Sequence, residues 1–269
     1  WGGNFTASRF ALNEFSPYFM LLLRFAGVVL VLAPFVWRHP IPRFREMAMI
    51  SLFLIVIQFS FVFSAMNMGL SITSVVVATQ LGVPFACVLA ASLFKDYLGP
   101  WRSGGLMVAF LGVLIVAGTP NASEHWGAFV LAVLGSFGWS VANVHLKRME
   151  PTPHVVPLLF WPALISLVPL ALLSLMLESG QSASLSAAHW TGWAGIAYSL
   201  FFSSLLGYGL WNRLIVTYPM SAVVPYSLLV PVVGIAGGVI TMGDPLTLQV
   251  VLGTLLTIIG VGVISVGAR

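Results

Sequence analysis

The sequence predicts an all-α integral membrane protein whose ten transmembrane helices form two inverted repeats of five helices each. Of its 269 residues, 59% are hydrophobic and 7% are charged, whereas a soluble domain carries about 25% charged residues. Apolar stretches recur from the first residues to the last, so neither a signal peptide nor a single anchor accounts for them. Matching residues also recur in the same order in both halves of the chain.

Ten apolar runs are candidates for membrane spans. A crossing helix needs about 20 mostly apolar residues, because the bilayer core offers the backbone no hydrogen-bond partner. The predicted spans are 1–13, 18–37, 46–68, 71–94, 101–118, 125–147, 155–177, 191–213, 219–242 and 247–268. At about 1.5 Å per residue the first run is too short to cross before Glu14. We therefore expect that residues preceding Trp1 are missing from the chain.

The placement of positive charge predicts the orientation, because short cytoplasmic loops collect Lys and Arg. The connections after the second, fourth, sixth and eighth spans and the end of the chain carry Arg38, Arg43, Arg45, Lys95, Arg102, Lys147, Arg148, Arg213 and Arg269. The other connections carry Glu14, Glu124, Glu178 and Asp244, with no Lys or Arg. Both termini are therefore predicted to be cytoplasmic.

A repeat relates a first unit, residues 1–119, to a second unit, residues 125–269. The matched pairs are Ser74 with Ser221 and Pro84 with Pro231, 147 positions apart, and Gly105 with Gly253 and Gly112 with Gly260, 148 apart. Chance is the alternative in a chain so rich in glycine and apolar residues, but the shared order favours a repeat. Because five is an odd number, the second unit enters the membrane from the opposite side. Many secondary transporters have this architecture.

Pro84 and Pro231 mark the candidate binding site. A proline inside a helix leaves the carbonyl four residues earlier without its donor, which here means the carbonyls of Gln80 and Ser227. A bare carbonyl is costly in hydrocarbon, so it is expected to face protein or a water-filled cavity. We therefore expect Pro84 and Pro231 to act as hinges beside a central site. A packing kink repaired by neighbouring hydroxyl groups is the alternative.

Polar and aromatic side chains in the spans complete the candidate site. Polar side chains in membrane spans face the bundle interior, where they either join helices or contact solute. Trp139 shares a helix face with Asn143, as Tyr208 does with Trp211. The predicted substrate-binding residues are Asn4, Phe63, Thr79, Gln80, Trp139, Asn143, Tyr208, Trp211, Tyr226 and Ser227.

The few ionisable residues within the spans restrict the solute and the coupling. Arg24 either reaches outward to Glu14 or to helix-end carbonyls, or contacts a solute. Asp and Glu fall only at helix ends, so a carboxylate proton relay has no candidate, and His145 is a weak one. A phosphate-bearing solute would require several Lys or Arg, and only Arg9 and Arg24 are available. A neutral or zwitterionic solute, such as an amino acid, fits better.

Other functional classes lack their sequence signals. The single cysteine, Cys87, lies in an apolar run and gives no thiol cluster for a metal, so neither metal nor cofactor is expected. The scattered Lys and Arg form no stripe for nucleic acid. No His-Glu-x-x-His motif or nucleophile motif is present, so we do not expect an enzyme. The expected partners are a small-molecule substrate and membrane lipid. A channel or a non-transporting membrane protein is the alternative.

Six short segments resemble patterns of the EamA family of the drug/metabolite transporter superfamily: Trp1–Phe5, Leu23–Phe25, Gln58-Phe59 followed by Asn67, Trp139 with Asn143, Gly207–Trp211 and Ser227–Gly234. The resemblance covers nearly the whole chain and is closest to bacterial exporters of O-acetylserine and cysteine, with aromatic amino-acid exporters more distant. It implies ten helices in two inverted repeats in the bacterial inner membrane. It also implies alternating-access export of amino acids or related metabolites through a cavity lined by the first, third, fourth, sixth, eighth and ninth helices. Another small metabolite or a drug is the alternative cargo.

Overall fold

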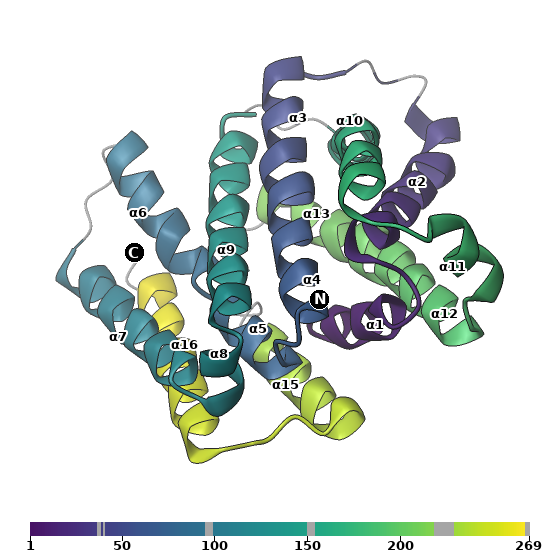
Figure 1. Ribbon diagram of the computed structural model, residues 1–269. Helices are drawn as coiled ribbons and strands as arrows, with labels where there is room; N and C mark the ends of the chain where they lie inside the picture. Colours follow the sequence, from purple (N-terminus) through teal and green to yellow (C-terminus); the bar gives the residue numbers. More distant parts are fainter. Residues whose placement is uncertain (37–38, 40, 95–98, 150–153, 218–228, 267–269) are drawn as a thin grey trace.

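The computed structural model of the protein describes residues 1–36, 39, 41–94, 99–149, 154–217 and 229–266, and within these ranges every regular element is a helix (Figure 1). Eight helical stretches are long and apolar enough to cross a membrane: Pro17–Val36, Phe44–Asn67, Ile72–Leu93, Pro100–Ala117, Trp126–Lys147, Val155–Leu177, Trp190–Trp211 and Leu248–Val266. The protein is therefore an all-α, multi-pass membrane protein. Helix α1 (Gly2–Leu12) and helix α15 (Leu229–Met242) occupy the first and ninth predicted spans but are shorter, so the count of ten crossings stays a prediction.

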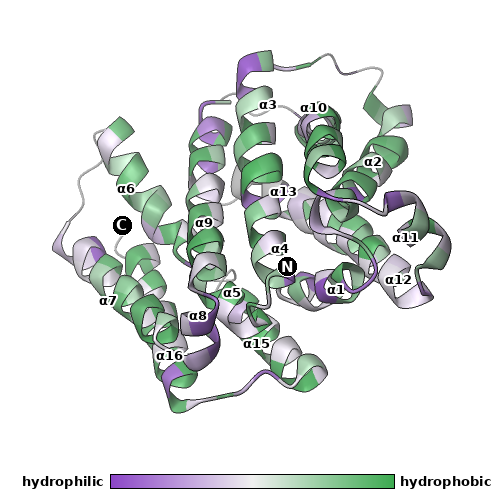
Figure 2. Cartoon of the chain, in the orientation of Figure 1, coloured by the Kyte–Doolittle hydropathy of each residue, from purple (hydrophilic) through white to green (hydrophobic). Residues whose placement is uncertain are grey.

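The outer faces of the long helices are apolar. Leu30, Met176 and Ile240 are between 76% and 81% exposed in the isolated protein. Figure 2 shows mainly hydrophobic residues along the long helices, while hydrophilic residues gather near helix ends and in connections. An apolar surface of this extent is stable when it faces lipid acyl chains and not water.

Helix α2 (Pro17–Val36) lies beside α10 (Val155–Leu177). A side chain beyond the end of α10 completes the start of α2, because Glu178 accepts hydrogen bonds from the backbone N–H groups of Tyr18 and Phe19 at 2.7 and 3.0 Å. The first N–H groups of a helix have no partner within the helix, and a carboxylate also complements the helix dipole there. Glu178 thus joins two helices that are far apart in the sequence.

The third and eighth predicted spans each contain a π-helical segment. The third comprises α3 (Phe44–Ile50), η1 (Ser51–Phe59) and α4 (Ser60–Asn67). The eighth comprises α12 (Trp190–Tyr198), η2 (Ser199–Tyr208) and α13 (Gly209–Thr217). The two π-helical segments begin 148 positions apart. π-Helical segments are rare in proteins overall, but those that occur are frequently found at functional sites.

The fourth predicted span is broken into α5 (Ile72–Thr79) and α6 (Gly82–Phe94). The expectation that the carbonyl of Gln80 lacks a donor is wrong, because this carbonyl accepts a hydrogen bond from the backbone N–H of Val83 at 3.3 Å. The break precedes Pro84, which is the third residue of α6, where its missing N–H costs no helical hydrogen bond. Pro231 lies in α15, close to its first described residue, Leu229. Ser227 lies outside the described residues.

Helices α7 (Pro100–Ala117) and α16 (Leu248–Val266) contact each other through glycines. A Cβ atom added to Gly105 would lie 2.8 Å from the carbonyl oxygen of Gly260, and one added to Gly253 would lie 2.6 Å from that of Gly112. Small residues allow two helix backbones to approach closely in a membrane. We call these four residues the glycine seam.

The glycine seam predicts a position-specific loss of stability. Gly105→Val should lower the free energy of unfolding by about 1–3 kcal/mol, the usual cost of overpacking, measured in detergent by thermal denaturation. The matched control is Gly104→Val, because a Cβ atom at Gly104 has nothing within 4 Å. Equal stability losses in the two variants would contradict the seam as a packing contact.

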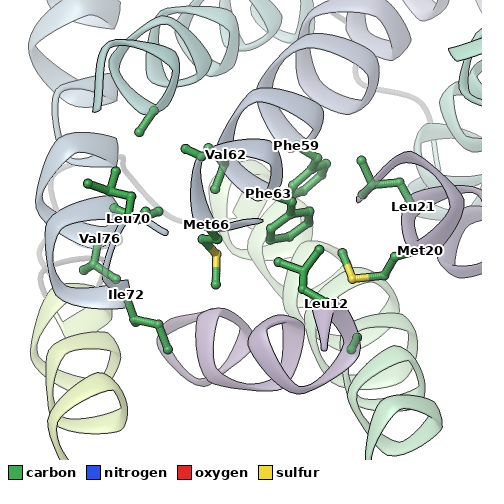
Figure 3. Packing of buried hydrophobic residues seen from close by; sticks show 14 of the residues in the cluster. Leu12, Met20, Leu21, Phe59, Val62, Phe63, Met66, Leu70, Ile72 and Val76 are labelled. Carbon is green, nitrogen blue, oxygen red and sulfur yellow. The ribbon is translucent and has the colours of Figure 1, made fainter. Parts of the chain in front are cut away.

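The remaining helices surround the centre of the bundle. The short α8 (Pro120–Glu124) leads into α9 (Trp126–Lys147), and the short α11 (Gln181–Ala187) follows α10. Helix α9 contacts η1 and α4 on one side and α5 and α6 on another, while α1 contacts α12 and α15. The buried apolar core lies between these groups. Figure 3 shows the rings of Phe59 and Phe63, whose centroids are 5.8 Å apart, beside Leu12 and Met20.

Candidate functional site

A cavity of about 250 Å³ lies inside the bundle. Drug-sized ligand pockets range over about 300–1,000 Å³, so this cavity suits a smaller solute. Eight predicted substrate-binding residues line it, namely Asn4, Phe63, Thr79, Gln80, Trp139, Asn143, Tyr208 and Trp211. The structure thus brings together residues separated by up to 207 positions in the sequence. The other two predicted residues, Tyr226 and Ser227, lie outside the described part of the chain.

The cavity wall is built from helices far apart in the chain. Asn4 comes from α1 and Phe63 from α4, while Thr79 and Gln80 lie at the break between α5 and α6. Helix α9 contributes Trp139 and Asn143, the η2–α13 stretch contributes Tyr208 and Trp211, and α15 contributes Val230. Pro84 and Pro231 are buried and do not line the cavity, but each lies one residue beyond a lining residue, Val83 or Val230.

One side of the cavity is aromatic. The ring of Trp1 lies 4.9 Å from that of Tyr208 and 5.0 Å from that of Trp211, measured between centroids. Phe59 meets Tyr208 edge-on at 6.5 Å. The indole N–H of Trp1 donates to the carbonyl of Ser203 at 3.3 Å. Aromatic faces attract cations, so this wall can receive an ammonium group as well as an apolar side chain.

A smaller cavity of about 60 Å³ adjoins the central one. Both cavities share the lining residues Phe59, Trp139, Asn143, Tyr208 and Trp211. The smaller cavity continues to Ile50, Leu146 and Leu158. These residues lie near the helix ends for which the sequence predicts a cytoplasmic location.

The lining includes two polar atoms that have no hydrogen-bond partner in the part of the chain that the structure describes. Asn4 Oδ1 and Gln58 Oε1 are buried without a hydrogen bond among the described residues. An unsatisfied buried acceptor costs about 1–3 kcal/mol, so these two oxygens can accept hydrogen bonds from a bound molecule. In contrast, the Thr79 hydroxyl already donates to the carbonyl of Val76, and the Asn143 amide donates to that of Trp139, each at 2.8 Å.

Arg24 lies behind the cavity wall, fully buried at 0% exposure. Its Nε donates to Ser204 Oγ at 2.9 Å and its Nη2 to Ser203 Oγ at 3.3 Å. The guanidinium carbon is 4.6 Å from the ring centroid of Phe59. Of the alternatives for Arg24, the outward contact with Glu14 is not made, because Glu14 lies 3.3 Å from His189 Nδ1. The reason is geometric, since the serine hydroxyl groups of η2 offer Arg24 partners within the bundle.

His145 and Glu46 form a pair near one end of the bundle. His145 Nδ1 lies 2.6 Å from Glu46 Oε2, and both side chains are largely buried. Neither residue lines the two cavities that share the aromatic wall. The weak candidate for a proton relay is therefore engaged with a carboxylate outside the candidate site. No group of three or more His, Cys, Asp or Glu that could hold a metal ion occurs among the residues whose positions are described.

Several lining residues were not among the predicted site residues, including Trp1, Phe59 and Ser203. Ser203 and Tyr208 are five positions apart on η2, the spacing that a π-helical turn places on one side. An α-helical period puts positions three or four apart together, so it does not group these two residues. The pair Ser203-Ser204 in an otherwise apolar span was the available signal.

The chain is similar in sequence to bacterial membrane transporters. The profile of the EamA-like transporter family matches residues 1–118 and again residues 126–266. A protein of Salmonella typhimurium named "Probable amino-acid metabolite efflux pump" is 30% identical, over 100% of this chain and 92% of its own. A protein of the same name from Escherichia coli is 29% identical over the same shares. The uncharacterized transporter YyaM of Bacillus subtilis is 28% identical over 97% of this chain and 88% of its own.

A solved crystal structure shares the fold. It aligns with a TM-score of 0.63 at 18% identity and covers 99% of this chain and 96% of that chain. The likeness supports the arrangement of the helices alone, since identity at this level says nothing of the solute.

Proposed function

Since the chain belongs to the EamA-like transporter family, we propose that it exports amino acids or related small zwitterionic metabolites across a bacterial inner membrane. The observation that carries the proposal is the central cavity, whose described lining combines aromatic rings with amide and hydroxyl groups and includes no Asp, Glu, Lys or Arg. The efflux-pump names of two relatives support the same direction of transport.

The cavity lining favours a zwitterion over an ion of either sign. A cation would find no carboxylate among the described lining residues, and a phosphate would find no Lys or Arg there. An ammonium group can be bound by the aromatic wall and by the free oxygens of Asn4 and Gln58. The side chain of an amino acid would then contact Val62, Phe63 and Val83.

The proposal includes ten transmembrane helices in two inverted repeats, residues 1–119 and 125–269. In support, the family profile matches twice, and the π-helical segments begin at corresponding positions, Ser51 and Ser199. In this arrangement α1 and α15 are the first and ninth crossings. The contacts between helices also correspond. Helix α1 contacts α12 and α15, which belong to the eighth and ninth spans, and α9 contacts the helices of the matching third and fourth spans.

The glycine seam supports the same symmetry. Gly105 lies opposite Gly260, and Gly112 lies opposite Gly253. Gly253 and Gly260 are the repeat counterparts of Gly105 and Gly112, each 148 positions later in the chain. The contact of Gly105 with Gly260 therefore has the contact of Gly253 with Gly112 as its counterpart when the two repeats are interchanged. A twofold axis between the repeats requires this exchange.

We further propose alternating access, with a cavity that faces the cytoplasm in this structure. The end of the bundle predicted to be outside is tied by hydrogen bonds: Asp244 Oδ2 accepts from the Thr73 N–H and hydroxyl at 2.8 and 2.9 Å, and Asn121 Oδ1 accepts from the Ser71 N–H at 2.8 Å. Arg9 donates to the carbonyl of Met66 at the same end. The smaller cavity leads toward the opposite end. The broken fourth span, with Pro84, and the start of α15, with Pro231, are the proposed hinges.

The contact between Asp244 and Thr73 gives a test of this outer closure. Asp244→Ala should destabilise the protein by about 0.5–2 kcal/mol, comparable to the loss of a helix cap. It should also increase labelling of Thr79→Cys, in a Cys87→Ser background, by an impermeant maleimide added from outside. The control is Glu124→Ala, because Glu124 is exposed. Unchanged labelling with Asp244→Ala would count against closure at this end.

Transport itself is tested with the full chain in proteoliposomes. A panel of radiolabelled amino acids should show saturable counterflow, which a channel cannot produce. The assay repeated with and without a proton gradient determines whether protons are coupled to transport. Saturable counterflow of other metabolites, together with none for any amino acid, would overturn the assigned cargo. Cysteine labelling of Arg43→Cys and Arg148→Cys from one and the same side would support the proposed orientation, with both termini cytoplasmic.

A further inference from the structure

Arg24 is the only Arg, Lys, Asp or Glu in the described ranges that is fully buried, and its hydrogen-bond partners there are neutral. Burying an ion is costly unless an opposite charge compensates it. No carboxylate lies within ion-pair distance of Arg24 among the described residues. Its Nη1 atom is also buried without a hydrogen-bond partner. Among the described residues, the positive charge of Arg24 is therefore uncompensated.

Ser203 connects this charge to the cavity. Its hydroxyl oxygen accepts from Arg24 Nη2, and the residue itself lines the cavity. A hydroxyl that accepts from a guanidinium directs its own hydrogen elsewhere, and no acceptor for that hydrogen is found among the described residues. Phe59 also lies between Arg24 and the cavity, since its ring contacts the guanidinium and the residue lines the cavity. One layer of side chains thus stands between Arg24 and the solute space.

We infer that Arg24 and Ser203 form the subsite for the carboxylate group of the solute. This inference rests on the proposed function, because it assumes that the solute occupies the central cavity. Ser203 donates a hydrogen bond to the carboxylate, and Arg24 is a positioning residue that orients the hydroxyl and supplies the opposite charge. The free amide oxygens of Asn4 and Gln58 accept hydrogen bonds from the ammonium group. The solute is therefore held in one orientation.

A purely structural role for Arg24 makes a different prediction. Arg24 joins α2 to η2 through two serine hydroxyl groups, and loss of this link alone would weaken binding of every solute equally. Recognition of a carboxylate instead affects only solutes that carry one. The ratio of affinities for an amino acid and for its amide, which keeps the ammonium group but lacks the carboxylate, therefore separates the two roles.

The experiment compares L-leucine with L-leucinamide, and L-serine with L-serinamide, as competitors of counterflow in proteoliposomes with the full chain. In the wild type, we expect each amino acid to compete at least about tenfold better than its amide, because a hydrogen bond to an ionised carboxylate is about twice as strong as one to a neutral group. A tenfold difference in affinity corresponds to about 1.4 kcal/mol. Arg24→Gln should reduce this preference to within about twofold. Arg24→Lys keeps the positive charge but loses the planar guanidinium group, so it should retain part of the preference for the amino acid over its amide.

The matched controls distinguish this subsite from general effects. Arg45→Gln removes a positive charge from an exposed position and should leave the preference unchanged. Ser203→Ala removes one small hydroxyl group and should also reduce the preference, which keeps the test decisive if Arg24→Gln fails to fold. An unchanged preference in both Arg24→Gln and Ser203→Ala would overturn the inference while leaving amino-acid export intact. Absence of counterflow for every amino acid in the wild type would instead overturn the proposed function.

Discussion

Ala86→Trp should reduce amino-acid counterflow at least about tenfold. Ala86 lines the central cavity, whose volume is about 250 Å³, and an indole ring there would occupy much of the space that a solute needs. A tenfold loss of affinity corresponds to about 1.4 kcal/mol, which lies within the usual cost of overpacking, about 1–3 kcal/mol. The measurement is the initial rate of counterflow in proteoliposomes, normalised to the amount of inserted protein.

The control for Ala86→Trp lies two residues further along the same helix. Val88→Trp adds a comparable ring at a side chain that is 44% exposed, where it would face lipid, and we expect near-normal transport. Full activity of Ala86→Trp, with normal insertion, would mean that solute does not pass through this cavity.

Tyr208→Leu is the second change with a large expected effect, a loss of solute affinity of about tenfold. The Tyr208 ring contacts both Trp1 and Phe59 in the aromatic wall. A desolvated contact between a cation and an aromatic ring contributes about 2 kcal/mol, and the wall also loses its packing. Tyr208→Phe keeps the ring and should retain most of the affinity. The half-saturating concentration for counterflow measures both variants.

Phe202→Leu provides the comparison for Tyr208→Leu within the same π-helical segment. Phe202 is 58% exposed and does not line either cavity, so its replacement should not change affinity. If Tyr208→Leu and Phe202→Leu reduced affinity equally, the effect would belong to the helix and not to the aromatic wall.

The positions of the helices could be predicted from the sequence because lipid leaves the backbone few options. An apolar run bounded by polar residues must be helical across the bilayer. The predicted span 155–177 coincides with α10, and the predicted span 125–147 differs from α9 by one residue. The eight predicted site residues that the structure describes line one cavity for a related reason, since polar side chains in lipid-embedded helices turn toward the interior.

The local geometry of the site could not be predicted in the same way. The π-helical segments η1 and η2 change which side chains share a face, and no simple residue pattern marks them. The fourth span breaks between Thr79 and Gly82, where Ser140 Oγ donates to the carbonyl of Gly82. Pro84 in the sequence indicates a disturbed helix but does not give the residue at which the helix breaks. The partners of Arg24 lie about 180 positions away in the chain, a distance over which single-sequence reasoning gives no contact.

The glycine seam has a consequence for work with this protein. Helices α7 and α16 touch backbone to backbone, and neither contributes a residue to the two cavities that share the aromatic wall. The α7–α16 pair therefore packs beside the two cavities without forming part of their walls. The lipid-facing positions of α7 and α16 are suitable attachment points for spectroscopic probes. A covalent crosslink between the two helices should leave the central cavity accessible to solute.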